Sequence, residues 1–324
     1  MIQITLLDSP NWKDYALLDS GNGLKLERFG SYTFVRPEAQ AMWSPALLEK
    51  EWGAADAVFQ PTGEESGGHW QFRKQMDERW EMGYALTPSP LPRGEGQRGM
   101  GLRFYAMTTP GRHLGVFPEV AAHWDWMVHL IHHRTHKEHG EKGKNSVISA
   151  ANPQPKILNL FGYTGLATLA CAAAGAQVTH VDASKKSIGW ARENQALSGL
   201  ADKPVRWLVD DALKFVQREA RRGTRYDGII LDPPKFGRGP KGEVWEVYKS
   251  LPRLLDACRE LLSPKPLFVV LTIYAVQASA IHAGQALTDI VEDFGGSVEQ
   301  GELVTRERSA GRLLSQAVYA RWGE

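Results

Sequence analysis

The sequence predicts a doubly wound α/β domain preceded by a small β-rich domain, and two patterns carry this prediction. From Lys156 onward, short apolar stretches alternate with longer amphipathic ones, as in consecutive βαβ units. This alternation is typical of a parallel sheet covered by helices on both faces. Before about residue 110, the chain is instead rich in glycine, tryptophan and short alternating runs, which favours strands joined by tight turns.

The expected elements of the second half follow one another in a regular order. Apolar periodicity and length separate the strands from the helices. Strands are expected at 156–161, 176–182, 204–210 and 226–232, and helices at 165–175, 184–200 and 211–223.

Composition shifts divide the chain into three expected segments. Residues 1–112 form the β-rich domain, in which the turn signals G-N-G and F-G separate strand-like pieces between residues 15 and 38. Residues 113–155 contain a connecting helix over 117–133, with Pro118 in its first turn, and then a polar linker. Residues 156–324 form the α/β domain. The Pro/Gly/Arg-rich stretch 87–101 is expected to be a surface loop.

The composition is that of an ordinary soluble globular protein, with 43% apolar and 23% charged residues among 324. No apolar run has the roughly 20 residues that span a membrane, and the first residues lack a signal-peptide layout, so a cytoplasmic protein is expected. The net charge of +1 leaves any nucleic-acid surface to local clusters. A homo-oligomer is compatible with these features, which do not specify one.

Metal and disulfide sites are not expected. The only cysteines, Cys171 and Cys258, lie in apolar, helix-like stretches and are predicted to be reduced core residues. Four histidines, at 132, 133, 136 and 139, lie in a charged, solvated stretch without cysteines, which disfavours a metal site.

The fourth predicted strand ends in the unusual sequence IILDPPKFGRGPKG, residues 229–242. Pro233 and Pro234 cannot donate to a strand ladder, so they end the strand, and each pushes the preceding residue into extended backbone. The strand tip therefore offers the Asp232 carboxylate and backbone carbonyls without neighbouring N–H groups. Taken alone, such a sequence is more often a strand cap followed by a loop.

The other strand ends carry candidate ligand residues at the same sheet edge. A glycine-bearing turn follows the first strand, an acid that can accept from ribose hydroxyls follows the second, and a carboxylate that can read an adenine edge follows the third. Helix capping is the alternative for Asp182 and Asp211. Together these ends predict a nucleoside ligand, and the missing G-x-G-x-x-G pattern favours S-adenosylmethionine over a dinucleotide. The predicted cofactor residues are Asn159, Phe161, Gly162, Tyr163, Thr164, Gly165, Asp182, Ala183, Ser184, Asp210, Asp211, Ala212 and Asp232.

Residues 156–236 resemble class I S-adenosylmethionine-dependent methyltransferases. LNLFGYTGLATLACAAAGA, VDASKKSIGWARENQ, DDALKFV and LDPPKFGRG together resemble the group that modifies large-subunit ribosomal RNA, and HLGVFPEVAAHWDWM is similar to its joining segment. The resemblance implies a Rossmann-like sheet, S-adenosylmethionine as cofactor and RNA as partner. It also implies that Phe161, Tyr163 and Gly165 line the methionine side, Asp182 the ribose, Asp211 the adenine, and residues 232–236 the target.

The sequence departs from the cytosine-C5 members of that group, which need a cysteine after the fifth strand. Here that position reads FVVLTIYAVQAS, with no cysteine, so a nitrogen acceptor is expected instead. Asp232 and the Pro233 carbonyl would accept from an exocyclic amine, Phe236 would stack on a flipped base, and Lys235, Arg238 and Lys241 would hold phosphates. The predicted catalytic residues are Asp232, Pro233, Pro234, Lys235 and Phe236. For Phe236 an apolar loop anchor is the alternative, and for the three cations a solvated loop.

Three functions are compatible with these patterns. The first is an RNA N-methyltransferase, and the second is a methyltransferase of small molecules or proteins. The third is a catalytically silent RNA-binding or assembly factor that keeps the fold. The intact Asp232-Pro233-Pro234 favours an active enzyme, and the β-rich domain with the basic loop favours a macromolecular substrate.

Overall fold

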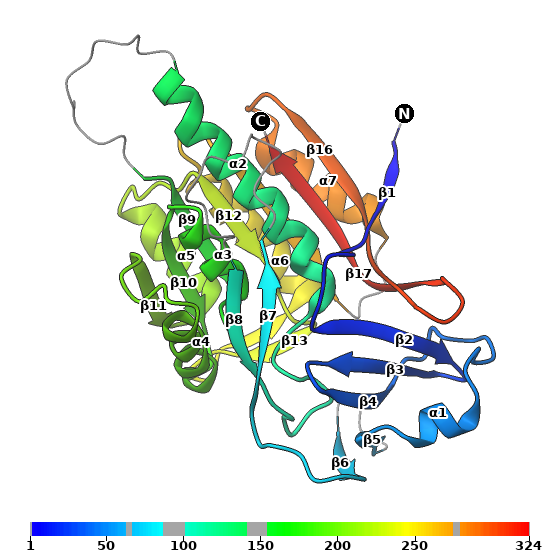
Figure 1. The fold of residues 1–324 in the computed structure, drawn as a ribbon. Coiled ribbons are helices and arrows are strands. Elements are labelled where there is room, and N and C mark those ends of the chain that lie inside the picture. Colours follow the sequence, from blue (N-terminus) through cyan, green and yellow to red (C-terminus); the bar gives the residue numbers. More distant parts are fainter. Residues whose placement is uncertain (1, 63–66, 87–100, 141–153, 275–278, 324) are drawn as a thin grey trace.

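A computed structural model describes residues 2–62, 67–86, 101–140, 154–274 and 279–323, with the backbone alone for 135–140 (Figure 1). Most of the stretch predicted as a surface loop at 87–101, and of the predicted linker at 134–155, lies outside these residues. Within the described part, no helix is both long and apolar enough to cross a membrane.

An eight-stranded sheet forms the centre of the molecule, in the order β1-β16-β17-β15-β12-β9-β10-β11. Only β17 runs antiparallel to its neighbours. Its strands are β1 (Ile4–Leu7), β9 (Lys156–Leu160), β10 (Gln177–Asp182), β11 (Val205–Val209), β12 (Gly228–Leu231), β15 (Phe268–Ile273), β16 (Ser297–Arg306) and β17 (Leu313–Gly323). The chain order reverses beside β9, which pairs with β10 on one side and β12 on the other, and ligands bind at such a switch point in α/β sheets.

Alternate residues of each central strand are buried against helices on opposite faces. Ile157, Ile230 and Val270 pack in one core with α2 and α3, whereas their strand neighbours pack in another with α5, α6 and α7. The helices are α2 (Ala121–Gly140), α3 (Leu166–Ala173), α4 (Lys185–Leu197), α5 (Ala212–Arg221), α6 (Val247–Arg259) and α7 (Ala280–Val291). The doubly wound α/β fold is therefore confirmed.

The first part of the chain is rich in strands, as predicted. A five-stranded sheet has the order β2-β3-β4-β5-β6, and β7 pairs with β8. Asn22 and Gly23, with φ of 52° and 75°, form the tight turn that the G-N-G signal predicts between β2 and β3. The elements are β2 (Tyr15–Gly21), β3 (Leu24–Phe29), β4 (Tyr32–Pro37), α1 (Glu49–Gly53), β5 (Ala57–Pro61), β6 (Gly68–Phe72), β7 (Trp80–Ala85) and β8 (Gly101–Ala106).

Strand β1 differs from the predicted division, because it lies within residues 1–112 yet pairs in parallel with β16 of the large sheet. Thr5 lies opposite Gly301, where an added Cβ would be only 1.7 Å from the Thr5 carbonyl oxygen. Glycine at position 301 thus permits the close approach of β1. No local pattern in the first residues indicates which sheet they join.

The connecting segment begins with a 3-10 turn, η1 (Pro118–Val120), and continues as α2. Trp124, Met127 and Val128 are buried as the helical spacing predicts. The helix continues to Gly140, beyond its predicted end at residue 133. The extension contains arginine, lysine and glutamate, which are good helix formers and need no apolar partner surface.

Candidate active site

The turn after β9 has an unusual backbone. Phe161 and Tyr163 have φ of 59° and 49°, a left-handed conformation that few non-glycine residues adopt, and Gly165 begins α3 with φ of 84°. Such conformations are concentrated at ligand-binding sites. A Cβ added to Gly162 would be 2.3 Å from Cε1 of His180, so this position requires glycine.

A buried polar network lies beneath the turn after β9 and supports it. Asn159 Nδ2 donates to Thr168 Oγ1 at 2.9 Å, and that hydroxyl is 2.9 Å from His180 Nδ1. Burial lowers the pKa of His180 to about 3, so the ring is neutral. The network fixes the ring on which Gly162 packs.

Asp182, at the end of β10, ties the turn to the next helix. Its Oδ2 accepts from the Tyr163 backbone N–H at 2.9 Å, and its Oδ1 from the Ser184 N–H at 2.8 Å. Burial raises the pKa of this carboxyl. Ser184, rather than Asp182, caps α4, through a hydrogen bond from the Ser187 N–H. Ala183 lies between them, and each carboxylate oxygen retains a second lone pair.

The residues after β11 lie at the same sheet edge and have local partners. Asp210 forms an ion pair with Arg218. Asp211 caps α5 by accepting from the Lys214 N–H at 2.9 Å, and Ala212 begins that helix. The capping alternative is therefore observed for Asp211 but not for Asp182.

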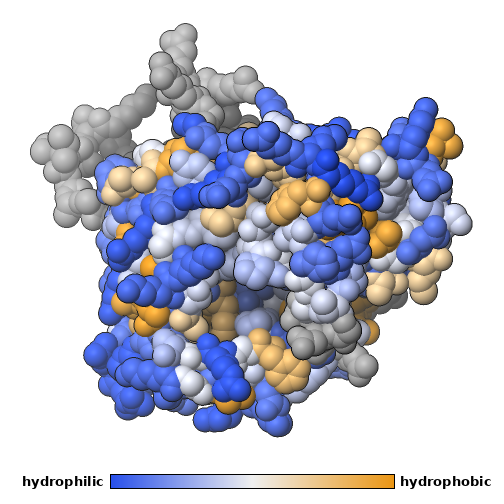
Figure 2. Space-filling model, turned by 90° about the horizontal axis from the view of Figure 1, so that it is seen from below, coloured by the Kyte–Doolittle hydropathy of each residue, from blue (hydrophilic) through white to orange (hydrophobic). Residues whose placement is uncertain are grey.

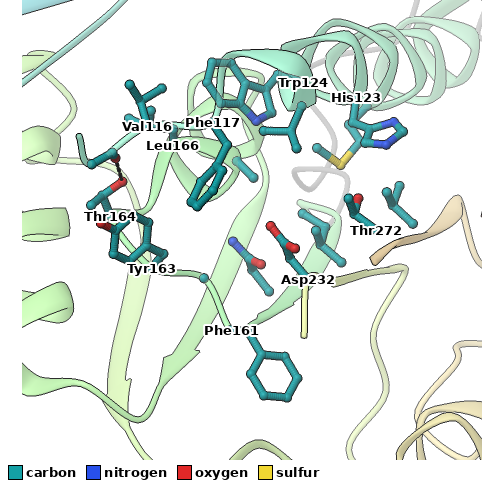
Figure 3. A pocket seen from close by; sticks show the side chains of 18 residues that line it. Val116, Phe117, His123, Trp124, Phe161, Tyr163, Thr164, Leu166, Asp232 and Thr272 are labelled. Atoms are coloured by element: carbon teal, nitrogen blue, oxygen red, sulfur yellow. Dashed lines mark hydrogen bonds between the residues drawn. The ribbon is translucent and has the colours of Figure 1, made fainter. Parts of the chain in front are cut away.

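A hollow at the switch point brings together the β9 turn, the tip of β12 and the connecting segment (Figure 3). It has about 560 Å³ of empty space open to solvent. Seen from below, the molecular surface is hollowed near its centre, with both hydrophilic and hydrophobic side chains around the opening (Figure 2). The lining includes the predicted residues Asn159, Phe161, Gly162, Tyr163, Thr164 and Asp232. The other lining residues were not predicted as site residues; they are Gly115, Val116, Phe117, Val120, His123, Trp124, Met127, Leu166, Ala167, Ile230, Val270 and Thr272. Asp182 and Asp211 do not line it.

Two predicted residues contribute backbone rather than a ligand-facing side chain. The ring of Phe161 points away from Phe117 and Tyr163 (Figure 3) and packs on Trp245 at 4.8 Å between centroids. The Thr164 hydroxyl is buried and donates to the Gly115 carbonyl at 2.7 Å, which fastens the turn to the connecting segment.

Asp232 directs its carboxylate into the hollow (Figure 3). Burial, and then the charge of Glu119, raise its pKa to about 7. Among the described residues, no donor reaches this carboxylate or the Pro233 carbonyl. The Pro234 carbonyl accepts from Trp245 Nε1 at 2.7 Å. The tip therefore offers the Asp232 carboxylate as an acceptor for a ligand, and the buried Pro233, which does not line the hollow, has a carbonyl without a donor among the described residues.

A known structure decides the family. The S-adenosylmethionine-dependent methyltransferase from Agrobacterium tumefaciens is 45% identical, with a TM-score of 0.83, over 98% of this chain and 93% of that one. This chain belongs to the S-adenosylmethionine-dependent methyltransferases. Residues 142–283 also match the sequence family of that description. The predicted family, fold class and cofactor are thereby confirmed.

Two further similarities are partial. Ribosomal RNA large subunit methyltransferase K/L of Shewanella frigidimarina is 34% identical over 137 residues, which are 42% of this chain but 18% of that protein. This methyltransferase therefore matches less than a fifth of the length of that relative. A structure described as an S-adenosylmethionine-dependent methyltransferase from Streptococcus mutans has 13% identity and a TM-score of 0.64, over 97% of this chain and 76% of that one, and shows the same fold.

A short hairpin of the methyltransferase follows the Asp232 tip. It consists of β13 (Phe236–Arg238) and β14 (Val244–Glu246), and the Lys214–Glu243 ion pair joins it to α5. Phe236 is 59% exposed and nearby Tyr248 is 60% exposed. Lys235 Nζ lies 5.6 Å from the Phe236 ring centroid, and Arg238 and Lys241 are exposed. An exposed aromatic ring beside cations favours the stacking interpretation of Phe236 over an apolar anchor.

Both cysteines of the methyltransferase are fully buried, Cys171 in α3 and Cys258 in α6. Burial raises the pKa of Cys171 to about 12 and that of Cys258 further. Neither thiol lies in the hollow or ionises at neutral pH, so neither is suited to act as a nucleophile.

Among the residues near the site that were not predicted from the sequence, Phe117, Glu119 and Tyr274 lie in contact. The Phe117 ring lies 5.9 Å from that of Tyr163 and 5.2 Å from that of Tyr274. Glu119 accepts from the Tyr274 hydroxyl at 3.0 Å. The only sequence signal was an acid at position 119 within the otherwise apolar stretch VFPEVAA.

Proposed function

We propose that this methyltransferase transfers a methyl group to an exocyclic nitrogen of a base in ribosomal RNA. The observation that carries the proposal is the Asp232 carboxylate, which lines the hollow and receives no hydrogen bond from the described residues. The RNA substrate is supported by the name of the Shewanella relative and by the exposed aromatic and cationic hairpin. A cytoplasmic location is proposed with it.

The residues of the sheet edge fit an adenosine-bearing methyl donor. The glycine-dependent turn over His180 lets backbone come close to a ligand, and the hollow beside Tyr163 is largely apolar. Asp182 would hold the ribose, residues 159–165 the methionine end, and residues 210–212 the adenine. When bound, S-adenosylmethionine supplies a methyl group on a positively charged sulfur.

Asp232 and Pro233 would orient the acceptor amine. Each accepts one N–H, which directs the nitrogen lone pair toward the methyl group. The reacting atoms are then already oriented, so the entropic part of the activation free energy is smaller. Positioning of this kind contributes about 7–11 kcal/mol in the best intramolecular cases. The buried thiols support a nitrogen rather than a ring-carbon acceptor, since carbon methylation of cytosine needs a free thiolate.

The hairpin would hold the RNA around the target. Phe236 offers a stacking face, worth about 1–3 kcal/mol per base, and the neighbouring cations offer phosphate contacts. A base reaches a buried carboxylate only when it leaves its helical stack, and a stacking residue at the entrance stabilises that extruded state.

The test is radiolabelled methyl transfer onto total RNA from cells that lack the protein, compared with RNA from normal cells. We expect label in the ribosomal RNA of the first preparation and little in the second, whose target is already methylated. Equal labelling of the two preparations, or label in neither, would contradict the proposal.

The methylation rate should depend on pH through Asp232. Burial raises its pKa to about 7, and only the ionised carboxylate can both accept the amine N–H and take up the proton that the nitrogen loses. The single-turnover rate should therefore rise from pH 6 to pH 8, with a midpoint near 7. A rate independent of pH over this range would show that the ionisation of Asp232 does not control the reaction.

RNA binding should depend on salt through the hairpin. Replacing Lys235, Arg238 and Lys241 together by alanine should flatten the plot of log affinity against log salt, by about 0.7–0.9 for each phosphate that the hairpin no longer neutralises. Replacing Lys50, Lys185 and Lys186, which are exposed and not part of the hairpin, is the control. An unchanged slope in the hairpin variant would place the RNA surface elsewhere.

A further inference from the structure

A second cavity lies between the first β-rich region and the large sheet. Its walls come from three distant parts of the chain, namely residues 8–17 leading into β2, the η1 turn, and residues 304–308 at the end of β16. It has about 780 Å³ of empty space open to solvent, more than the hollow that contains Asp232. None of the predicted cofactor residues lines this cavity.

Glu119 lies at the boundary between this interdomain cavity and the hollow. This residue lines the interdomain cavity, whereas Phe117 and Val120, on either side of it in the chain, line the hollow. Glu119 is only 5% exposed, and its carboxyl accepts from the Tyr274 hydroxyl at 3.0 Å. A buried carboxyl whose donors are all neutral costs free energy to ionise, and it retains lone pairs for a further donor.

The rest of the interdomain cavity suits a nucleotide. Trp12 and Tyr15 supply aromatic wall on one side. Arg308, which also lines the cavity, is exposed, and no acidic side chain of the described residues lies within ion-pair distance of it. Arg306 beside it is held by Asp8 at 3.5 Å. The cavity thus combines apolar aromatic surface, an available cation for phosphate and a buried acceptor beside the reactive tip.

We propose that the acceptor base, held at the Asp232 tip, extends to the boundary with the interdomain cavity, that this cavity admits the adjoining part of the RNA, and that Glu119 contacts the base as a second carboxyl. This inference rests on the proposed function for the identity of the acceptor, a nucleobase with an exocyclic amine. Glu119 would accept an N–H of the base while Asp232 accepts from the reacting amine. The amine lone pair forms the N–CH₃ bond as the S–CH₃ bond breaks with its electron pair on sulfur, and the displaced N–H proton passes to Asp232.

The charge of Glu119 affects the pKa of Asp232, and this effect can be measured. Glu119 from η1 and Tyr274, which follows β15, face Asp232, and Glu119 raises the pKa of Asp232. Lys25 and Glu27 of β3 face Glu119 with opposite effects on its pKa, and burial raises that pKa overall. Tyr15 also interacts with the Glu119 charge. Removing the Glu119 charge therefore lowers the pKa of Asp232.

The experiment compares the parent with Glu119→Gln, Tyr274→Phe and the control Glu302→Gln, a partly buried carboxyl on β16 outside both cavities. An extract of cells lacking the protein is separated into RNA, protein and small molecules, and the fraction that accepts radiolabelled methyl groups serves as substrate. Circular dichroism and calorimetric S-adenosylmethionine titration establish that each variant is folded and binds the cofactor.

We expect Glu119→Gln to lower the single-turnover rate at least tenfold, with cofactor affinity within twofold, and to move the midpoint of the pH–rate profile to lower pH. Tyr274→Phe, which removes the hydroxyl that donates to Glu119, should lower the rate by a smaller factor. If Glu119→Gln does not fold, the rate of Tyr274→Phe tests the role of Glu119 instead, and an unchanged rate would contradict it. Glu302→Gln should match the parent.

A Glu119→Gln rate within twofold of the parent, or a lower rate with no shift of the pH midpoint, would overturn the role of Glu119. Labelling of the protein or small-molecule fraction would contradict the proposal that the substrate is RNA. The same variants, assayed with the labelled fraction, would still test the role of Glu119. Labelling of no fraction would overturn both proposals.

Discussion

The Asp232→Asn variant should transfer methyl groups orders of magnitude more slowly than the parent while its affinity for S-adenosylmethionine changes little. The substitution keeps the size of the side chain but replaces one acceptor by an NH₂ donor, directed at the N–H of the substrate amine. No donor among the described residues reaches the Asp232 carboxylate, so the substitution breaks no hydrogen bond within that part of the chain. A loss confined to the rate is expected for an interaction made mainly in the transition state.

Single-turnover assays and calorimetric titration of the cofactor separate these two effects. The matched control is the double variant Cys171→Ala, Cys258→Ala, which should stay within a few-fold of the parent rate, because both thiols are buried in helices away from the hollow. It should lose some stability through emptied core volume. A folded but inactive cysteine variant, or an active Asp232→Asn, would be incompatible with the nitrogen mechanism.

The Asp182→Ala variant should bind S-adenosylmethionine about 10- to 150-fold more weakly, as expected when charged hydrogen bonds of about 1.5–3 kcal/mol are lost. The structure adds a second reason for this loss. The same carboxylate accepts from the backbone N–H groups of Tyr163 and Ser184, so its removal also loosens the cofactor turn.

Calorimetric titration measures the affinity, and thermal unfolding measures the cost of the two backbone hydrogen bonds. Asp202→Ala, an exposed carboxylate in the turn before β11, is the control and should match the parent in both. Asp182→Asn keeps one acceptor oxygen and should fall between the parent and Asp182→Ala. An Asp182→Ala affinity equal to that of the parent would show that the acid only supports the turn.

The sequence predicted those parts of the fold that depend on neighbouring residues. The alternation of apolar strands with amphipathic helices located each βα unit from Lys156 to Leu231. It did not reveal that β1 joins the large sheet, because that pairing depends on a glycine about three hundred positions away, Gly301. Nor did it fix the end of α2, whose last turns carry no apolar pattern.

The same division applies to the candidate site. The glycine turn and the Asp-Pro-Pro tip could be predicted because consecutive residues determine their backbone conformations. Whether an acid after a strand caps a helix or faces a ligand depends on side-chain direction, which is why Asp211 and Asp182 differ. Glu119 and Tyr274 meet across 155 positions, and no local pattern predicts such a contact.

The central claim is that the acceptor is a nitrogen of an RNA base held at the Asp232 tip. Its most direct test is mass spectrometry of nucleosides from RNA methylated in a single turnover by the parent enzyme. We predict one new methylated nucleoside with the methyl group on an exocyclic nitrogen, and none with Asp232→Asn. A methyl group on a ring carbon, or the same product from Asp232→Asn at the parent rate, would contradict the account.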